Sequence, residues 1–376
     1  MSLSTRQLNR ATLARQLLLR REPLDAAEAV RRVVALQAQE PASPYIALWS
    51  RVAEFDPADL DAAFAEYSVV KASLMRVTLH AVHAEDHPRF HDAMVSTLRA
   101  SRLDDRRFTE GGLSVAAIDE ILPHVLGSVT RPHTRGELED VLATRVGERK
   151  KSAFWALKTF APLHHAPTGG PWSFRSQASF VAAPTRLRPG SQDASVAWLL
   201  RRYLEGFGPA TAEDFARFTL LKRSVARDAI TALGSDVEQL EGPHGSALFD
   251  IVGGVRPDHD VPAPPRLLPM WDSVLLAHAD RSRVIEPDHR PLVTRRNGDV
   301  LPTLLVDGRV EGVWRTVEGG IEATAFRSLS DEAWNGLATE AASLVAFLAE
   351  RDPKPYRRYD HWWAAMPAAD VRVLPG

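Results

Sequence analysis

Two glutamines, two residues apart, are the side chains with the clearest potential for chemistry in this 376-residue chain. Gln37 and Gln39 lie in residues 35–41, and Pro41 disfavours helical backbone at the residue before it. In extended backbone, residues i and i+2 point to the same side. The pattern therefore predicts two amides that project together from a helix end. Amides donate and accept hydrogen bonds but are not strong bases, so the pair can hold a water or a polar ligand, or simply be solvated.

Four histidines gather in one later stretch, at His80, His83, His87 and His91. Their spacing suggests a zinc site, because imidazole is a common zinc ligand. However, His80 and His83 are three apart on a predicted strand and face opposite sides, Pro88 interrupts the run, and the chain has no cysteine. We predict no metal and no cofactor, and we keep His80, with the nearby Arg76, as candidate site residues.

The first part of the chain is expected to carry the glutamine pair on helices. Periodicity predicts helices at 3–20, 25–37, 57–67 and 84–103, and β-rich alternation predicts a strand at 77–82. Asp56 is a good N-cap, and Pro57 fits the first helical turn. The predicted second helix reaches Gln37, which places the glutamine pair at its end.

Two later stretches each repeat three helices followed by a β-hairpin. In residues 114–183, helices are expected at 114–127, from a capping box at Thr134 and Glu137, and at 149–161, with strands at 172–174 and 180–182. In residues 193–253, helices are expected at 193–206, from an N-cap at Thr211, and from 222 to about 234, with strands at 237–240 and 247–252. This order is typical of a winged helix, so the sequence predicts tandem winged-helix units with nucleic acid as the default partner.

Basic pairs stand at the starts of both predicted recognition helices. They are Lys150 with Lys151 and Lys222 with Arg223. Phosphate contact is natural there, and we predict that these residues bind DNA. The alternative is a solvated helix terminus, since surface lysine and arginine are common.

A different segment follows a proline-rich connector at 257–265. Residues 301–317 are expected to form a β-hairpin around Asp307-Gly308, a strong turn signal. Ser330 is expected to cap a final helix that reaches about Glu350.

Composition is that of an ordinary soluble globular protein, with 45% hydrophobic and 25% charged residues and a net charge of −2. No run of 18 apolar residues is present, and the start lacks the features of a signal peptide. Absence of cysteine excludes disulfides. We expect a cytoplasmic protein without a membrane span, acting as a monomer.

Several stretches together resemble a known family. They are 34–39 (VALQAQ), 43–51 (SPYIALWSR), 74–80 (LMRVTLH), 207–211 (FGPAT), 267–272 (LLPMWD) and 306–315 (VDGRVEGVWR). They look like the bacterial tandem winged-helix DNA glycosylases, and the resemblance runs nearly end to end. The glutamine motif and the SPY and LWSR that follow it are its specific part.

The resemblance implies a mainly helical α+β fold with three winged-helix units that form a concave DNA-binding surface. Their expected boundaries are 1–110, 111–190 and 191–256, and a C-terminal segment at 257–376 carries the hairpin and the final helix. It also implies that Gln37 and Gln39 are catalytic, with site-lining candidates Trp49, Arg51, Arg76 and His80. The usual Arg-Gly-Thr-Leu-His of the family here reads Arg-Val-Thr-Leu-His, with Val77 in place of glycine.

The implied activity is hydrolysis of the N-glycosidic bond of bulky N7-alkylguanine, including the unhooking of azinomycin-type interstrand crosslinks. Relatives often carry Gln-X-Asp, and a glutamine at the second place suggests the branch for bulky adducts. Alkylation at N7 makes guanine a good leaving group, and the sugar passes through an oxocarbenium-like state. Two amides can then suffice to position a water and favour the cationic sugar. We expect a monofunctional enzyme without lyase activity.

Double-stranded DNA that carries the lesion is the expected partner. A crosslinked guanine cannot swing out of the duplex as in base flipping, which predicts an open groove with a hairpin that probes the DNA. The 301–317 hairpin, with Arg309 at its tip, is the candidate, and an ordinary structural hairpin is the alternative. The other class of function is a non-catalytic winged-helix regulator or a protein that sequesters lesions.

Overall fold

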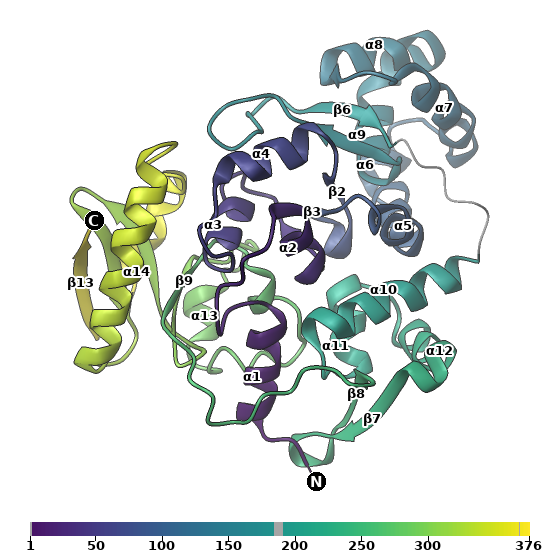
Figure 1. Cartoon of the computed structure of the whole chain (residues 1–376). Coiled ribbons are helices and arrows are strands. Elements are labelled where there is room, and N and C mark those ends of the chain that lie inside the picture. The colour runs from purple at the N-terminus through teal and green to yellow at the C-terminus, as the bar shows by residue number, and fades with distance from the viewer. Residues whose placement is uncertain (1, 184–190, 368) are drawn as a thin grey trace.

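The computed structural model describes residues 2–183, 191–367 and 369–376. Its first part holds five helices and three strands around the glutamine motif (Figure 1). The helices are α1 (Thr5–Arg15), α2 (Ala26–Arg32), α3 (Ser43–Trp49), α4 (Pro57–Ala65) and α5 (His87–Leu103). The strands are β1 (Leu36–Gln37), β2 (Val69–Ser73) and β3 (Leu79–His83). As predicted, Asp56 caps α4, with its side chain accepting from the Ala58 backbone.

The second part follows the short helix α6 (Arg106–Thr109) and has the same order of elements. After α7 (Val115–Ser128) come β4 (His133–Thr134), α8 (Arg135–Val146), α9 (Lys150–Phe160), β5 (Leu163–Ala166) and β6 (Ser179–Ala182). The predicted capping box at the start of α8 is confirmed, because Thr134 and Glu137 bond reciprocally. From α2 to β3 and from α7 to β6, the chain therefore runs helix, strand, helix, helix, strand, strand.

One six-stranded sheet joins the two parts, in the order β1-β3-β2-β5-β6-β4. Its two halves mirror each other, because β3 lies between β1 and β2 in one half and β6 lies between β4 and β5 in the other. The halves meet where Lys71 of β2 pairs with His165 of β5. The sheet thus fixes the glutamine-bearing strand relative to the second part.

The third part matches its prediction closely. Helices α10 (Gln192–Phe207), α11 (Ala212–Thr219) and α12 (Arg223–Leu233) precede the hairpin of β7 (Val237–Glu241) and β8 (Ala247–Ile251). Thr211 caps α11 in a capping box with Asp214. This hairpin is a separate two-stranded sheet, and Figure 1 shows it with α10–α12 on the side of the molecule opposite the C-terminal helix.

The C-terminal segment is built on a five-stranded sheet, in the order β13-β12-β11-β10-β9. Its strands are β9 (Arg266–Leu268), β10 (Thr303–Val306), β11 (Arg309–Val317), β12 (Gly320–Ala325) and β13 (Asp370–Pro375), and the short helix α13 (Arg290–Val293) precedes β10. Helix α14 (Asp331–Ala349), capped by Ser330 as predicted, packs on this sheet. The predicted hairpin is confirmed as β10–β11.

Two hydrophobic cores hold these parts together. One joins α2–α4 to the C-terminal sheet and includes Trp314 and Tyr45. The other joins α5 to the second and third parts and includes Phe90 and Tyr203. None of the helices in the described ranges is long and apolar enough to cross a membrane.

The structure corrects four predictions of helices and strands. The helix predicted at 3–20 ends at Arg15. The predicted helix 25–37 ends at Arg32, because Leu36 and Gln37 pair with β3 instead of continuing the helix. Strand β3 begins only at Leu79. Residues 172–174 are not a strand, and Trp172 instead buries its ring against Tyr45, with 5.2 Å between centroids.

Buried histidines make the fold sensitive to acid. Burial lowers the pKa of His80 and His278 to about 3 and that of His164 to about 4, from 6.5 in the unfolded chain. As the pH falls below 6.5, the unfolded chain takes up these protons first. We expect the free energy of unfolding, measured by urea denaturation, to fall by about 1.4 kcal/mol per pH unit for each such histidine between pH 6 and pH 5.

His164→Phe is expected to make this pH dependence shallower, whereas His124→Gln, a change at an exposed position of α7, leaves it as in the wild type. Equal slopes for the wild type and His164→Phe would show that His164 does not contribute.

Candidate active site

Gln37 is held in place by a strand of only two residues. Strand β1 pairs antiparallel with β3, and Gln37 lies opposite His80. Opposite residues in a pair of strands point to the same face of the sheet, so both side chains meet on one face. Gln37 is only 5% exposed, and His80 is fully buried.

Arg76 links these two side chains. Its Nη2 donates to Gln37 Oε1 at 2.8 Å and lies 3.3 Å from His80 Nε2. His80 Nδ1 lies 3.1 Å from the backbone oxygen of Thr78. Because a carbonyl oxygen can only accept, Nδ1 carries the proton and Nε2 accepts from Arg76. The two site-lining predictions Arg76 and His80 are thereby brought together with Gln37.

His80 is unsuited to be a general base. Burial, and then the neighbouring charge of Arg76, lower its pKa to about 3, and its one acceptor nitrogen already faces Arg76. The imidazole is neutral at physiological pH, yet it has no free lone pair for a water. Its role in this arrangement is to hold the arginine.

The backbone that presents Arg76 is strained. Arg76 and Val77 both adopt left-handed conformations, with φ of 55° and 59°. Such backbone is uncommon for any side chain and unfavourable for a β-branched one. Glycine would adopt it freely, which gives a physical reason for the glycine of the resembling motif at the position of Val77. Here the valine takes the same conformation at a cost.

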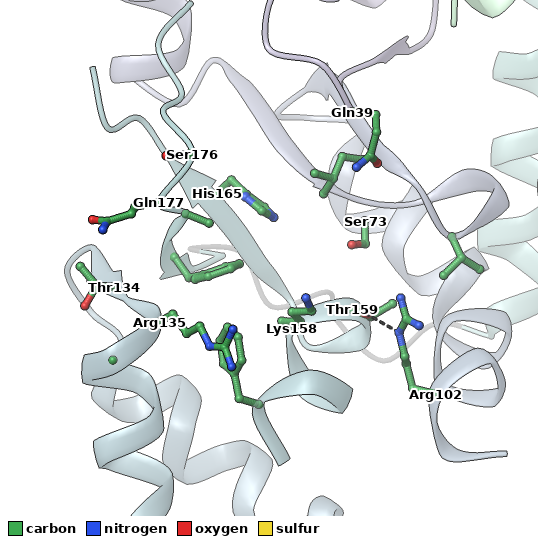
Figure 2. Close-up of a pocket in the computed structure, with 16 residues that line it drawn as sticks. Gln39, Ser73, Arg102, Thr134, Arg135, Lys158, Thr159, His165, Ser176 and Gln177 are labelled. Atoms are coloured by element: carbon green, nitrogen blue, oxygen red, sulfur yellow. Dashed lines mark hydrogen bonds between the residues drawn. The ribbon is translucent and has the colours of Figure 1, made fainter. Parts of the chain in front are cut away.

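Gln39 has a different environment from Gln37. It is exposed and lines a cleft of about 690 Å³ between the first and second parts of the chain (Figure 2). Gln37 is not among the lining residues. Figure 2 shows Gln39 on the same side of the cleft as Ser73, with His165 and Gln177 across from it. The cleft is lined by Gln39, Ser73, Val77, Leu79, Arg102, Thr134, Arg135, Gly136, Phe154, Lys158, Thr159, His165, Ser176, Gln177, Ala178 and Phe180.

Positive charge collects on the floor of this cleft, from Arg102, Arg135 and Lys158. Arg102 Nε donates to Thr159 Oγ1 at 2.8 Å, and Arg135 Nε pairs with Glu139 at 2.6 Å. Lys158 forms no ion pair with any residue in the described ranges. Burial, and then the charges of Arg102 and Arg135, lower the pKa of Lys158. A cleft with surplus positive charge favours an anionic ligand such as a DNA phosphate.

Trp49 and Arg51 do not line the cleft, and their surroundings give no support to their prediction as site-lining residues. Arg51 is fully buried and forms a bidentate ion pair with Asp272, at 2.9 and 2.8 Å. Trp49 is buried against Phe347, with 6.3 Å between ring centroids. Both tie the first part of the chain to the C-terminal segment, which makes them structural residues.

The basic pairs stand where they were predicted, at the starts of α9 and α12. Lys151, Lys222 and Arg223 are exposed. Lys150 lies 3.2 Å from Asp140, and Arg223 pairs with Glu213. Their contact with DNA stays a prediction.

The turn of the β10–β11 hairpin contacts α1, as the alternative of a structural hairpin predicts. Asp307 pairs with Arg6 and Arg10 of α1, and a Cβ at Gly308 would lie 2.5 Å from Leu13. Arg309 donates to the Ser282 backbone oxygen at 3.2 Å and pairs with Glu286. These contacts dock the turn on α1, and they give no support to a role of Arg309 at DNA.

The sequence did not point to the cations of the cleft. Arg102, Arg135 and Lys158 come from the end of α5, the start of α8 and the end of α9. No short motif contains them. The joining of β2 with β5 and the packing of α5 on α9 bring these helices beside Gln39.

Comparisons with known proteins support the resemblance. The chain is 28% identical over 346 residues to a Streptomyces sahachiroi protein named interstrand DNA cross-link repair glycosylase, covering 87% of this chain and 91% of that protein. Its fold matches the structure of Streptomyces sahachiroi DNA glycosylase AlkZ with a TM-score of 0.80, at 23% identity and covering 94% of this chain and 99% of that one. The family model described as DNA glycosylase AlkZ-like matches residues 30–347, and the chain therefore belongs to the AlkZ-like DNA glycosylase family.

Proposed function

We propose that this protein is a monofunctional DNA glycosylase that releases bulky N7-alkylguanine from duplex DNA, including guanine in azinomycin-type interstrand crosslinks. The observation that carries the proposal is the placement of the motif. Gln39 lies open to a cleft with surplus positive charge, and Gln37 is held beside it on a fixed strand. The relative named for interstrand crosslink repair gives the substrate class.

Hydrolysis of an N7-alkylguanine needs little acid or base catalysis from the protein. The bond from C1′ to N9 breaks, its electron pair returns to the purine, and the purine leaves as a neutral base because N7 was cationic. A water oxygen bonds to C1′, and its proton passes to solvent. Amides that orient the water and the sugar are sufficient for such a reaction. The nearby histidines, His80 and His165, have pKa values lowered by burial to about 3, so both are neutral at physiological pH and are weak bases.

Water rather than an amine is the proposed nucleophile. Lys71 is the buried lysine of the sheet, and burial lowers its pKa to about 8. Its Nζ lies 4.3 Å from the centre of the Phe174 ring, and the residue does not line the cleft. This placement disfavours Lys71 as the nucleophile of a lyase, and Lys158, the lysine that lines the cleft, is assigned to the DNA backbone.

The three repeated parts supply the proposed DNA-binding surface. We propose that each is a winged helix, on the basis of the order of helices and strands and of the hairpin that closes it. Lys151 and Lys222 at the exposed starts of α9 and α12 remain candidates for phosphate contact. A lesion that stays in the duplex needs an open groove, and the cleft beside Gln39 is open to solvent.

Removal of either glutamine amide tests the catalytic proposal. Gln37→Ala and Gln39→Ala are each expected to lower single-turnover release of N7-methylguanine from a duplex by about 100-fold or more, since each removes a positioned group at the reaction centre. Strand breaks after hot alkali report release. Gln177→Ala, across the cleft, is the matched control and is expected to keep most of the rate.

Release at the wild-type rate by both glutamine variants would remove the catalytic assignment. If the wild type binds the damaged duplex without alkali-labile breaks, the protein is a lesion-binding or regulatory protein instead.

The cleft cations give a second test, by the salt dependence of binding. Lys158→Ala is expected to weaken binding to a damaged duplex and to lower the slope of log K against log salt by about 0.9, the contribution of one phosphate contact. Lys354→Ala, at an exposed lysine of the C-terminal segment, should leave both quantities unchanged. Equal slopes for Lys158→Ala and wild type would place the DNA backbone elsewhere.

A further inference from the structure

We propose that Arg76 is a positioning residue that fixes the Gln37 amide with its oxygen turned inward, so that Gln37 meets the substrate only as an N–H donor. The inference rests on the proposed function and separates the roles of the two glutamines.

The chemistry of the contact determines the orientation of the amide. A guanidinium group has five N–H donors and no acceptor. The Gln37 atom 2.8 Å from Arg76 Nη2 is therefore its oxygen. The second hydrogen of Nη2 faces His80 Nε2 at 3.3 Å, and His80 is fixed in turn by the Thr78 backbone. The contacts run from Thr78 through His80 and Arg76 to Gln37, and each N–H group in this series donates to one acceptor.

The placement of Arg76 is itself energetically unfavourable. Its guanidinium lies over the Phe218 ring at 5.2 Å, and its Nη1 is buried without a hydrogen-bond partner in the described residues. Its backbone is left-handed. A buried unpaired donor and a strained backbone are each unfavourable. Burial, and then the charge of Arg281, lower its pKa to about 10, which leaves it charged at neutral pH.

A fixed cation behind Gln37 limits what this amide can do. Positive charge at Arg76 opposes a second positive charge nearby, so Gln37 is poorly placed to stabilise the oxocarbenium sugar. Its amide nitrogen makes no hydrogen bond within the described part of the chain. Two free N–H donors suit an acceptor on the purine, which gains electron density as the bond from C1′ to N9 breaks.

Gln39 has the complementary freedom. It is exposed in the cleft and makes no side-chain hydrogen bond with the residues that the structure describes. Its amide oxygen is therefore available to accept from the attacking water. The pair then divides the work, with Gln37 donating toward the leaving base and Gln39 accepting from the nucleophile.

Arg76→Ala tests the positioning role. We expect single-turnover release of N7-methylguanine to fall about tenfold or more, while the Kd for the same duplex stays within about twofold. Millimolar guanidinium chloride is expected to restore part of the rate, and the same concentration of sodium chloride is not. A purely structural role would move the thermal midpoint without this specific rescue. Arg89→Ala, which removes another arginine that lies over an aromatic ring, is the matched control.

Gln37→Glu tests the donor role without removing the arginine. The carboxylate of the variant can still accept from Arg76 and preserve the fold, but it has no N–H to donate. The variant is therefore expected to be as slow as Gln37→Ala. Wild-type rates in Gln37→Glu or in Arg76→Ala would overturn the inference. If Arg76→Ala does not fold, Arg76→Lys replaces it and is expected to have an intermediate rate. If guanidinium chloride changes the rate of Arg76→Lys no more than it changes that of the wild type, the proposal is contradicted. A wild type that releases no base would instead refute the proposed function itself.

Discussion

The pairing of β1 with β3 is the constraint on which the site depends. Two residues of strand are enough to end the helix that precedes them and to place Gln37 opposite His80. From there the chain diverges. Gln37 turns toward Arg76 in a buried setting, and Gln39 turns into the open cleft. Two identical side chains two residues apart therefore have different surroundings, and the difference comes from backbone pairing.

The same sheet also places the surplus charge. Because β2 pairs with β5, the second part of the chain is fixed against the first, and helices α8 and α9 bring Arg135 and Lys158 to the cleft beside Gln39. Several cations at other places in the fold form ion pairs with carboxylates. Arg51 is neutralised by Asp272 in the core, and Asp307 pairs with Arg6 and Arg10 at the hairpin turn. Lys158, in contrast, forms no ion pair with the residues that the structure describes.

Local signals predicted the fold well, and non-local contacts explain the errors. The caps at Asp56, Thr134 and Thr211 depend on residues within one helical turn, and all three are confirmed. The end of α2 was misplaced because β1 pairs with a strand more than 40 residues away. Likewise, a motif cannot tell whether Arg51 faces a substrate or an aspartate, and Asp272 lies 221 residues further on. The glutamine motif was found by its type and spacing, whereas the orientation of its first amide required the structure.

Hydrolysis at a lesion that remains in the duplex is the central feature of the proposed function, and a defined interstrand crosslink tests it most directly. A duplex with two guanines joined through N7, labelled on one strand, is incubated with the wild-type protein and resolved under denaturing conditions. The account predicts conversion to single-stranded product that breaks at the former crosslink after hot alkali. A crosslink that the protein binds but leaves intact under conditions in which it stays folded would contradict it.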